Sequence, residues 1–254
     1  MEELIREAAA RLAGVRKLAV LTGSGVSRES GIATFRDPEE GLWARYNPMD
    51  LATQEGYLRN PILVWQWYEH RFGMVEKAAP NPGHLAIAQL ERLISQVTVI
   101  TQNIDGLHQA AGSTDVIELH GSIRRYRCLG GRHTGFTRAD FAEQSSVPPT
   151  CPRCGDLLRP EVVWFGEMLP RAALERAFDL AENCDAMLVA GTSGEVQPAA
   201  SLPFYTARRG GLVVDVNPER DTIASIADIY LSGRGGSVLP QLVQAIEELR
   251  GTNG

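Results

Sequence analysis

The chain has 254 residues, of which 44% are hydrophobic, and it carries a formal net charge of -6 with a pI near 5.5. Such a chain can bury a core in one large domain, with or without an insert, which excludes a disordered or fibrous protein. The basic residues are spread along the sequence, so we expect no direct contact with nucleic acid. No run of 18 uncharged apolar residues is present, and no membrane span is expected.

Short apolar runs bounded by glycine or polar turns predict buried strands, and stretches of helical spacing lie between them. Residues 1–14 also have helical spacing and do not resemble a signal peptide. The predicted strands are Lys17 to Thr22, Val97 to Thr101, Ala186 to Ala190, Leu212 to Val216 and Ile229 to Leu231. The predicted helices are Pro61 to Val75, His84 to Ile94, Arg171 to Glu182, Ala199 to Arg209 and Val238 to Leu249. This alternation predicts an α/β fold with a doubly wound, Rossmann-like parallel sheet, whose ligand lies beyond the carboxyl ends of the strands.

Two regions interrupt the alternation. Residues 36–56 are irregular and follow the first glycine-rich turn, which favours a loop over a ligand. Residues 122–160 hold three cysteines and few apolar runs, which indicates a small inserted module. We therefore predict one unit whose large domain (about 1–35, 80–121 and 160–254) carries two small-domain segments, at about 36–79 and 122–159.

The first strand runs into a glycine-rich turn that contains Gly23, Ser24, Gly25 and Ser27. Glycines let the backbone approach a diphosphate, and main-chain N–H groups can point at it. Arg28 stands where the usual dinucleotide fingerprint has its third glycine, so the turn is not an ordinary dehydrogenase signature. Taken alone, it is equally compatible with a tight turn that binds nothing.

Polar residues follow the second strong strand, at Gln102, Asn103 and Asp105. Amide and carboxylate groups at the carboxyl end of a strand can bind a carboxamide and a ribose. An Asx-type turn would explain Asn103 and Asp105 equally well when this stretch is considered by itself.

His120 ends a short apolar stretch, and Gly121 leaves space beside it. Imidazole titrates near neutral pH and can take a proton from a hydroxyl group, which makes His120 a candidate general base. A single histidine of this kind is more often a hydrogen-bonded structural residue, so the motif gains weight only from its neighbours.

The order of the motifs supplies that weight. Gly-x-Gly-x-Ser-x-x-Ser-Gly-Ile is followed by Thr-Gln-Asn-Ile-Asp-Gly-Leu-His, Glu-Leu-His-Gly-Ser, a cysteine pair and Gly-Thr-Ser. From about residue 21 to 240 this order resembles the sirtuin family. The resemblance implies an enzyme that consumes NAD to remove acyl groups from lysine side chains of proteins or peptides, giving nicotinamide and O-acyl-ADP-ribose. His120 would be the base that activates a ribose hydroxyl.

The same resemblance implies positions for the two substrates. Those for NAD are Gly23, Ser24, Gly25, Ser27, Ile32, Phe35, Arg36, Trp43, Gln102, Asn103, Ile104, Asp105, Gly191, Thr192, Ser193, Asn217 and Gly235. The acyl-lysine peptide would pair with a strand at Val162 to Phe165, and would contact Val162, Phe165, Gly166 and Gly194. By itself, Val162 to Phe165 is also compatible with a plain buried strand.

Tyr68 and Arg71 are three residues apart on a predicted helix and so share a face. They resemble the Tyr-x-x-Arg pair of the sirtuin subgroup that removes succinyl, malonyl and glutaryl groups. A guanidinium binds a carboxylate through two hydrogen bonds, and a phenol adds a third. A surface helix with a solvated Arg71 is the alternative interpretation, and the small Ala33 is consistent with room for a longer acyl chain.

The cysteines predict a metal site that departs from the family pattern. Cys128, Cys151 and Cys154 are present, but Gly131 stands where a fourth cysteine is expected. A structural zinc needs four ligands, so either His133 completes the site or no metal is bound. Three thiols in such a pattern suit a metal rather than a disulfide framework, which favours a reducing, cytoplasmic setting. Cys184 is predicted to lie in the core.

Other functions remain open from sequence alone. An NAD-binding oxidoreductase would explain the sheet and the first turn but not the cysteine insert. Such an enzyme typically has the complete glycine fingerprint, which is missing here. A non-enzymatic zinc-ribbon module is a second alternative. Within the enzyme class, a plain deacetylase and a mono-ADP-ribosyltransferase would share the NAD site. The sequence does not determine the oligomeric state or the physiological substrates.

Overall fold

A parallel sheet forms the centre of the protein in this computed structural model, which describes residues 1–33 and 46–251. Six strands of the described residues form it in the order β3-β2-β1-β6-β7-β8, and all neighbouring pairs are parallel. The strands are β1 (Lys17–Thr22), β2 (Gln96–Thr101), β3 (Val116–Glu118), β6 (Ala186–Ala190), β7 (Leu212–Asn217) and β8 (Ile229–Ser232). The predicted doubly wound sheet is therefore confirmed, and the short β3 is an addition to it.

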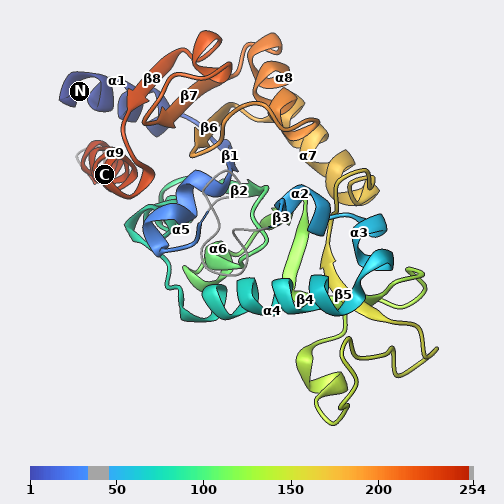
Figure 1. Cartoon of the computed structure of the whole chain (residues 1–254). Coiled ribbons are helices and arrows are strands. Elements are labelled where there is room, and N and C mark those ends of the chain that lie inside the picture. Colours follow the sequence, from blue (N-terminus) through green and yellow to red (C-terminus); the bar gives the residue numbers. More distant parts are fainter. Residues whose placement is uncertain (34–45, 252–254) are drawn as a thin grey trace.

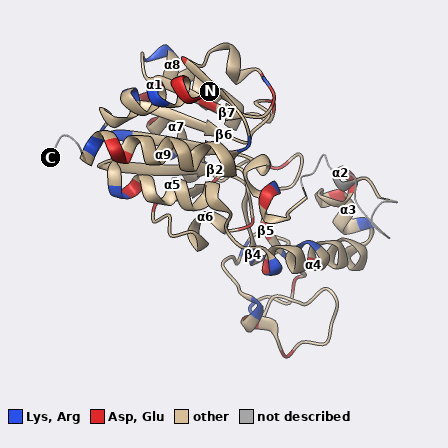
Figure 2. Cartoon of the chain, turned by 90° about the vertical axis from the view of Figure 1, so that its left-hand side faces the viewer, with Lys and Arg blue, Asp and Glu red and all other residues tan. Residues whose placement is uncertain are grey.

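Helices cover both faces of this sheet (Figure 1). Successive side chains of a strand point to opposite faces, so Leu18 and Val20 pack under one helical layer and Ala19 and Leu21 under the other. The first layer holds α1 (Glu2–Ala13), α5 (Pro82–Leu93) and α9 (Gly235–Gly251), which face the viewer in Figure 2. The second holds α7 (Arg171–Asn183) and α8 (Leu202–Arg208), which follows the 3-10 turn η4 (Ala199–Ser201). Within the described residues, no helix is long and apolar enough to cross a membrane.

A smaller group of elements lies beside the carboxyl edge of the sheet (Figures 1 and 2). It comprises α2 (Pro48–Leu51), α3 (Gln54–Arg59), α4 (Pro61–Lys77) and the antiparallel pair β4 (Gly121–Cys128) and β5 (Leu158–Val162). Helix α4 begins at a side-chain cap, because Asn60 accepts a hydrogen bond from the Leu63 amide at 3.1 Å. The buried rings of Trp67, Tyr57 and Trp164 form the core of this part.

Strands β1 and β6 are neighbours, although the chain continues from them toward opposite edges of the sheet. Such a switch point opens a crevice at the carboxyl ends of the strands. Here the two strand ends meet backbone to backbone, with the Gly25 amide donating to the Gly191 carbonyl at 2.8 Å. A Cβ on Gly191 would lie 2.4 Å from the Val26 nitrogen, and one on Gly25 would lie 2.7 Å from the Gly191 oxygen. Only glycines permit this contact.

We expect Gly191→Ala to destabilise the protein more than Gly210→Ala. Both glycines have a positive φ, of 61° and 81°, but a Cβ on Gly210 meets nothing within 4 Å. The control should therefore lose only about 1–2 kcal/mol of unfolding free energy, the cost of the left-handed backbone. Gly191→Ala should lose about 1–3 kcal/mol more, because its methyl group overlaps a fixed backbone. Urea unfolding measures both, and equal losses would contradict the close contact.

Candidate active site

His120 lies in the turn between β3 and β4, directly after the carboxyl end of the sheet. Its Nδ1 atom lies 2.9 Å from the Gln102 carbonyl oxygen. A carbonyl oxygen only accepts hydrogen bonds, so Nδ1 carries the hydrogen of the neutral ring and Nε2 is left with a lone pair. Burial lowers the pKa of His120 below its usual value, and the bond to Gln102 only partly offsets this. The ring is therefore held neutral, in the tautomer in which Nε2 can accept a proton.

The turn after β1 and the residues after β2 form one buried polar network. Ser27 Oγ donates to Asp105 Oδ2 at 2.8 Å and accepts from Asn103 Nδ2 at 2.9 Å. The Asn103 amide also donates to the Gly23 carbonyl at 3.1 Å. These side chains are at most 8% exposed. The structure thus brings together predicted site residues from two motifs that are about 80 positions apart.

A second bridge joins the carboxyl ends of β2, β6 and β7. Gln102 Nε2 donates to Thr192 Oγ1 at 3.0 Å, and Asn217 Nδ2 donates to the Thr192 carbonyl at 2.6 Å. Gly235 is the first residue of α9 and is buried. Ile32 and Ile104 pack against the apolar cluster of Tyr68 and Trp164. The predicted residues Phe35, Arg36 and Trp43 lie outside the described residues.

The predicted peptide-binding strand is shorter than expected, because β5 ends at Val162. The Val163 amide donates to the His120 carbonyl at 2.9 Å, and the Phe165 amide donates to the Ala52 carbonyl at 2.9 Å. The next residues leave the extended conformation, and Gly166 has a φ of 85°. Within the chain, β5 ends at Val162 and a turn closes between residues 164 and 167, and the pairing of Val162 to Phe165 with a peptide stays a prediction. Phe165 remains 44% exposed.

The other predicted peptide contact, Gly194, lies just beyond the Gly191 to Ser193 stretch with a φ of 66°. Thr222 Oγ1 donates to its carbonyl at 2.9 Å. Gly194 is thereby tied to the loop that follows β7. The last residue of β7, Asn217, is a predicted NAD contact.

Tyr68 and Arg71 lie on α4, and both side chains are buried, at 3% and 7% exposure. The interpretation of this segment as a solvated surface helix is therefore wrong for these two positions. Tyr68 accepts a hydrogen bond from Trp164 Nε1 at 2.8 Å. One Arg71 nitrogen lies 3.4 Å from the Ala33 carbonyl, next to the predicted nicotinamide contact Ile32.

The cysteine module brings four possible metal ligands together. The ligand atoms of Cys128, His133, Cys151 and Cys154 all lie within 4.8 Å of one another. His133 Nδ1 is 4.0 Å from Cys128 Sγ and 3.6 Å from Cys151 Sγ. A tetrahedral zinc with ordinary bond lengths holds sulfur and nitrogen ligands about 3.5 Å apart, so these residues fit a structural zinc. Cys184 lies outside the cluster and is 7% exposed, as predicted for a core residue.

Two buried histidines near the site were not predicted as site residues. His84 Nε2 lies 3.4 Å from Ser27 Oγ, and His108 Nε2 lies 2.9 Å from Thr22 Oγ1. Burial lowers the pKa of both, that of His108 to about 3, so both rings are neutral at physiological pH. In the sequence, His84 lies at the beginning of a predicted helix and His108 follows a glycine-containing turn. Neither sequence context distinguishes a site residue from a structural one.

Comparison with known proteins places the chain in a family. Residues 23–198 match the model of the Sir2 family. The NAD-dependent protein deacylase of Pyrococcus abyssi is 47% identical over 97% of this chain and 99% of its own length. A solved complex of a Sir2 homologue with NAD has a TM-score of 0.88 and 45% identity, covering 96% of this chain and 94% of that one. The protein Sir2Af2 bound to a myristoylated histone peptide has a TM-score of 0.79 and 38% identity, covering 99% of this chain and 100% of that one.

The chain thus belongs to the Sir2 family, the sirtuins.

We expect the purified protein to hold one zinc ion per chain and His133→Ala to weaken zinc binding. Substitution of a residue that hydrogen-bonds to a metal ligand lowers metal affinity about 10- to 100-fold. Removal of the ligand itself should therefore lower zinc affinity at least as much. His133→Cys should retain zinc, because thiolate is an equally good ligand. Zinc competition with a chromogenic chelator measures the affinities, with His70→Ala as a histidine control outside the cluster. Equal affinity for His133→Ala and the native chain would exclude His133 as a ligand.

Proposed function

We propose that this chain is an NAD-dependent protein-lysine deacylase. The observation that carries the proposal is the fixed tautomer of His120, whose Nε2 lone pair is available where the carboxyl ends of the strands converge. Its Sir2 family membership and the deacylase name of its 47% identical relative support the same activity.

The NAD site in this proposal follows the carboxyl edge of the sheet. The diphosphate would lie on the amides of the Gly23 to Ser27 turn, and the adenosine would lie between Asn217 and Gly235. The polar network of Ser27, Asn103 and Asp105 would face the nicotinamide. Bound NAD supplies the ADP-ribosyl group that receives the acyl group, with nicotinamide as the leaving group. Structures of relatives with NAD and ADP-ribose support this placement.

His120 would act as the general base. Its Nε2 takes a proton from a ribose hydroxyl, while the Gln102 carbonyl stabilises the resulting imidazolium through Nδ1–H. The 162–166 segment starts from the same turn, because Val163 donates to the His120 carbonyl. A lysine side chain that passes Val162, Phe165, Gly166 and Gly194 would then reach the base.

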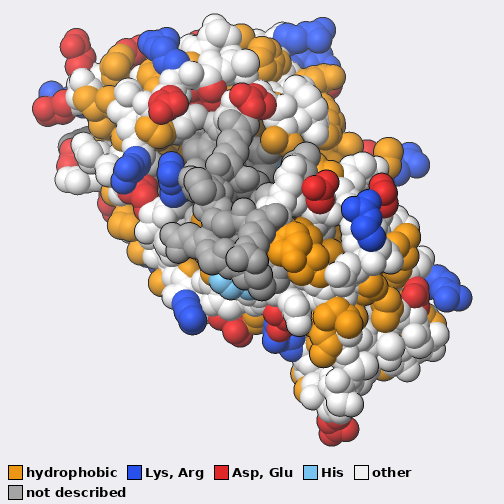
Figure 3. Space-filling model, in the orientation of Figure 1, with side chains coloured by type: hydrophobic (Ala, Val, Ile, Leu, Met, Phe, Trp, Pro, Cys, Tyr) orange, Lys and Arg blue, Asp and Glu red, His pale blue; other side chains and the backbone are white. Residues whose placement is uncertain are grey.

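We further propose that the enzyme accepts acidic acyl groups, namely succinyl, malonyl and glutaryl, in addition to acetyl. The acidic and basic side chains of the described residues are intermixed over the face in Figure 3. A carboxylate would need individual donors, and the buried Tyr68 and Arg71 provide a phenol and a guanidinium in one cluster with Ile32 and Ile104. The complex of Sir2Af2 with a myristoylated peptide supports the capacity of this fold for acyl groups larger than acetyl.

We expect Arg71→Met to reduce turnover of a succinyl-lysine peptide far more than that of the matched acetyl-lysine peptide. Loss of a charge-assisted hydrogen-bonding partner should lower kcat/KM for succinyl by about 10- to 100-fold, equivalent to 1.4–2.7 kcal/mol. The rate of nicotinamide release gives kcat/KM for both peptides. Lys77→Met, on the exposed end of the same helix, is the control and should leave the ratio unchanged. If the native chain prefers acetyl and Arg71→Met changes nothing, the protein is a plain deacetylase.

We expect the acid-side midpoint of the pH profile of kcat/KM with the acetyl peptide to lie below pH 6.5. The base must be neutral to act, and burial lowers the pKa of His120, so the active form persists to more acid pH than for a free imidazole. Activity should then fall tenfold per pH unit on the acid side, and His120→Ala should lose about 100-fold or more in rate. A midpoint at or above 6.5 that His120 controls would contradict this environment.

A further inference from the structure

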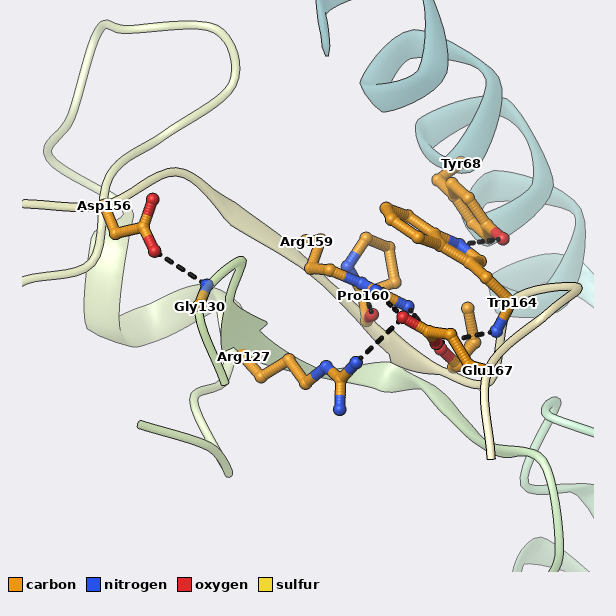
Figure 4. A network of polar contacts seen from close by, with 9 residues as sticks. Tyr68, Arg127, Gly130, Asp156, Arg159, Pro160, Trp164 and Glu167 are labelled. Carbon is orange, nitrogen blue, oxygen red and sulfur yellow. Dashed lines mark hydrogen bonds and ion pairs between the residues drawn. The ribbon is translucent and has the colours of Figure 1, made fainter. Parts of the chain in front are cut away.

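A partly buried ion pair lies beneath the proposed acyl site. Arg159, on β5, is 1% exposed and donates to both oxygens of Glu167, at 2.5 and 3.0 Å (Figure 4). Its NH2 group also donates to the Val162 carbonyl at 2.6 Å. Burial opposes the negative charge of Glu167, but the bonds from Arg159 and the Trp164 amide outweigh it and hold the pKa of the carboxyl below its usual value. Arg159 is buried and Glu167 is half-buried, and the hydrogen bonds between them offset the cost of removing the guanidinium from water.

This ion pair fixes Trp164 from two directions. Glu167 Oε2 accepts from the Trp164 amide at 2.9 Å, which closes the turn that ends the 162–166 segment. The Arg159 guanidinium lies over the indole ring, with its carbon 3.1 Å from the ring centroid. The ring of Tyr57 packs against the same indole at 5.3 Å. Because Trp164 is only 1% exposed and is held at both its backbone and its ring, the direction of its indole N–H is determined.

The indole N–H points at Tyr68, and this determines what the phenol can do. An indole nitrogen donates and cannot accept, so the Tyr68 oxygen is the acceptor of the 2.8 Å bond. The phenol hydrogen must then point elsewhere, and the structure pairs it with no acceptor among the described residues. Burial raises the pKa of Tyr68 far above neutrality, so this hydrogen is present at every physiological pH. Tyr68 is thus kept as a hydrogen-bond donor.

We propose that Trp164 is a specificity-determining positioning residue, which orients the Tyr68 hydroxyl as a donor to the terminal carboxylate of an acidic acyl group. Arg159 and Glu167 act through Trp164 by holding its backbone and ring. Arg71, one helical turn beyond Tyr68, provides the second partner of the carboxylate. This inference rests on the proposed acidic acyl preference and adds the residue that aligns the phenol.

The test is a double-mutant cycle on the succinyl-to-acetyl ratio of kcat/KM. Trp164→Phe removes the N–H and keeps an aromatic ring against Arg159, and Tyr68→Phe removes the hydroxyl. Each should lower the ratio about fivefold to tenfold, as expected for one weakened hydrogen bond to a charged group. The double variant should match Tyr68→Phe alone, because Trp164 acts only through that hydroxyl. Fully multiplied effects, or an unchanged ratio for Trp164→Phe, would overturn the proposal.

A second variant keeps the test independent of folding. Benzothienylalanine, incorporated at position 164 alone, replaces the N–H by sulfur in a ring of the same size, and it should lower the ratio as Trp164→Phe does. A ratio unchanged by this analogue would also overturn the role of Trp164. A native chain without succinyl preference would overturn both the acidic acyl function and this inference. A preference that Arg71→Met removes but Trp164→Phe leaves intact would overturn the positioning role alone.

Discussion

The backbone contact between the ends of β1 and β6 is the constraint on which the site depends. Because Gly25 and Gly191 have no side chains, the two strand ends approach until an amide meets a carbonyl at 2.8 Å. This closeness aligns the end of β1 with Thr192, which follows β6. The bonds of Thr192 to Gln102 and Asn217 extend the alignment to two further strands, β2 and β7. Gln102 in turn holds His120 through its carbonyl. The proposed base is thus positioned by backbone geometry that begins at the switch point.

Most polar side chains around the proposed site are buried or half-buried, and most of them are paired with one another. Ser27, Asn103 and Asp105 share hydrogen bonds between two turns, and Arg159 and Glu167 neutralise each other under Trp164. Unpaired groups at such depth would cost several kcal/mol each, whereas paired groups are held in fixed directions. Fixed directions are what the proposed deacylase reaction would need, because the proposed base, amide contacts and phenol would each act through one particular atom.

The sequence predicts the sheet well because its strands are continuous apolar runs between turns. It does not predict β4 and β5, whose outward side chains, such as Arg125 and Arg127, break the apolar pattern. Val162 to Phe165 has the composition of a strand, yet it stops at Val162 because Glu167 closes a turn on Trp164. Tertiary packing, rather than local propensity, decides that boundary.

The sequence predicts which residues form the candidate site, but it does not predict how their side chains are oriented. The motifs name His120, but only the bond to Gln102 shows which nitrogen is free. Spacing places Tyr68 and Arg71 on one face, but their burial and the bond from Trp164, 96 positions away, depend on the packing of α4 against β5. The missing fourth cysteine makes His133 a candidate ligand, and its distances to Cys128 and Cys151 show that the geometry suits a metal.

The most direct test of the proposed function is the identity and stoichiometry of the products. The native chain would be incubated with NAD and an acyl-lysine peptide, and the products would be quantified by mass spectrometry. We expect equal amounts of nicotinamide, deacylated peptide and O-acyl-ADP-ribose, with the acyl group recovered on the ribose. Formation of reduced nicotinamide, or transfer of ADP-ribose to the peptide with the acyl group still on lysine, would contradict it.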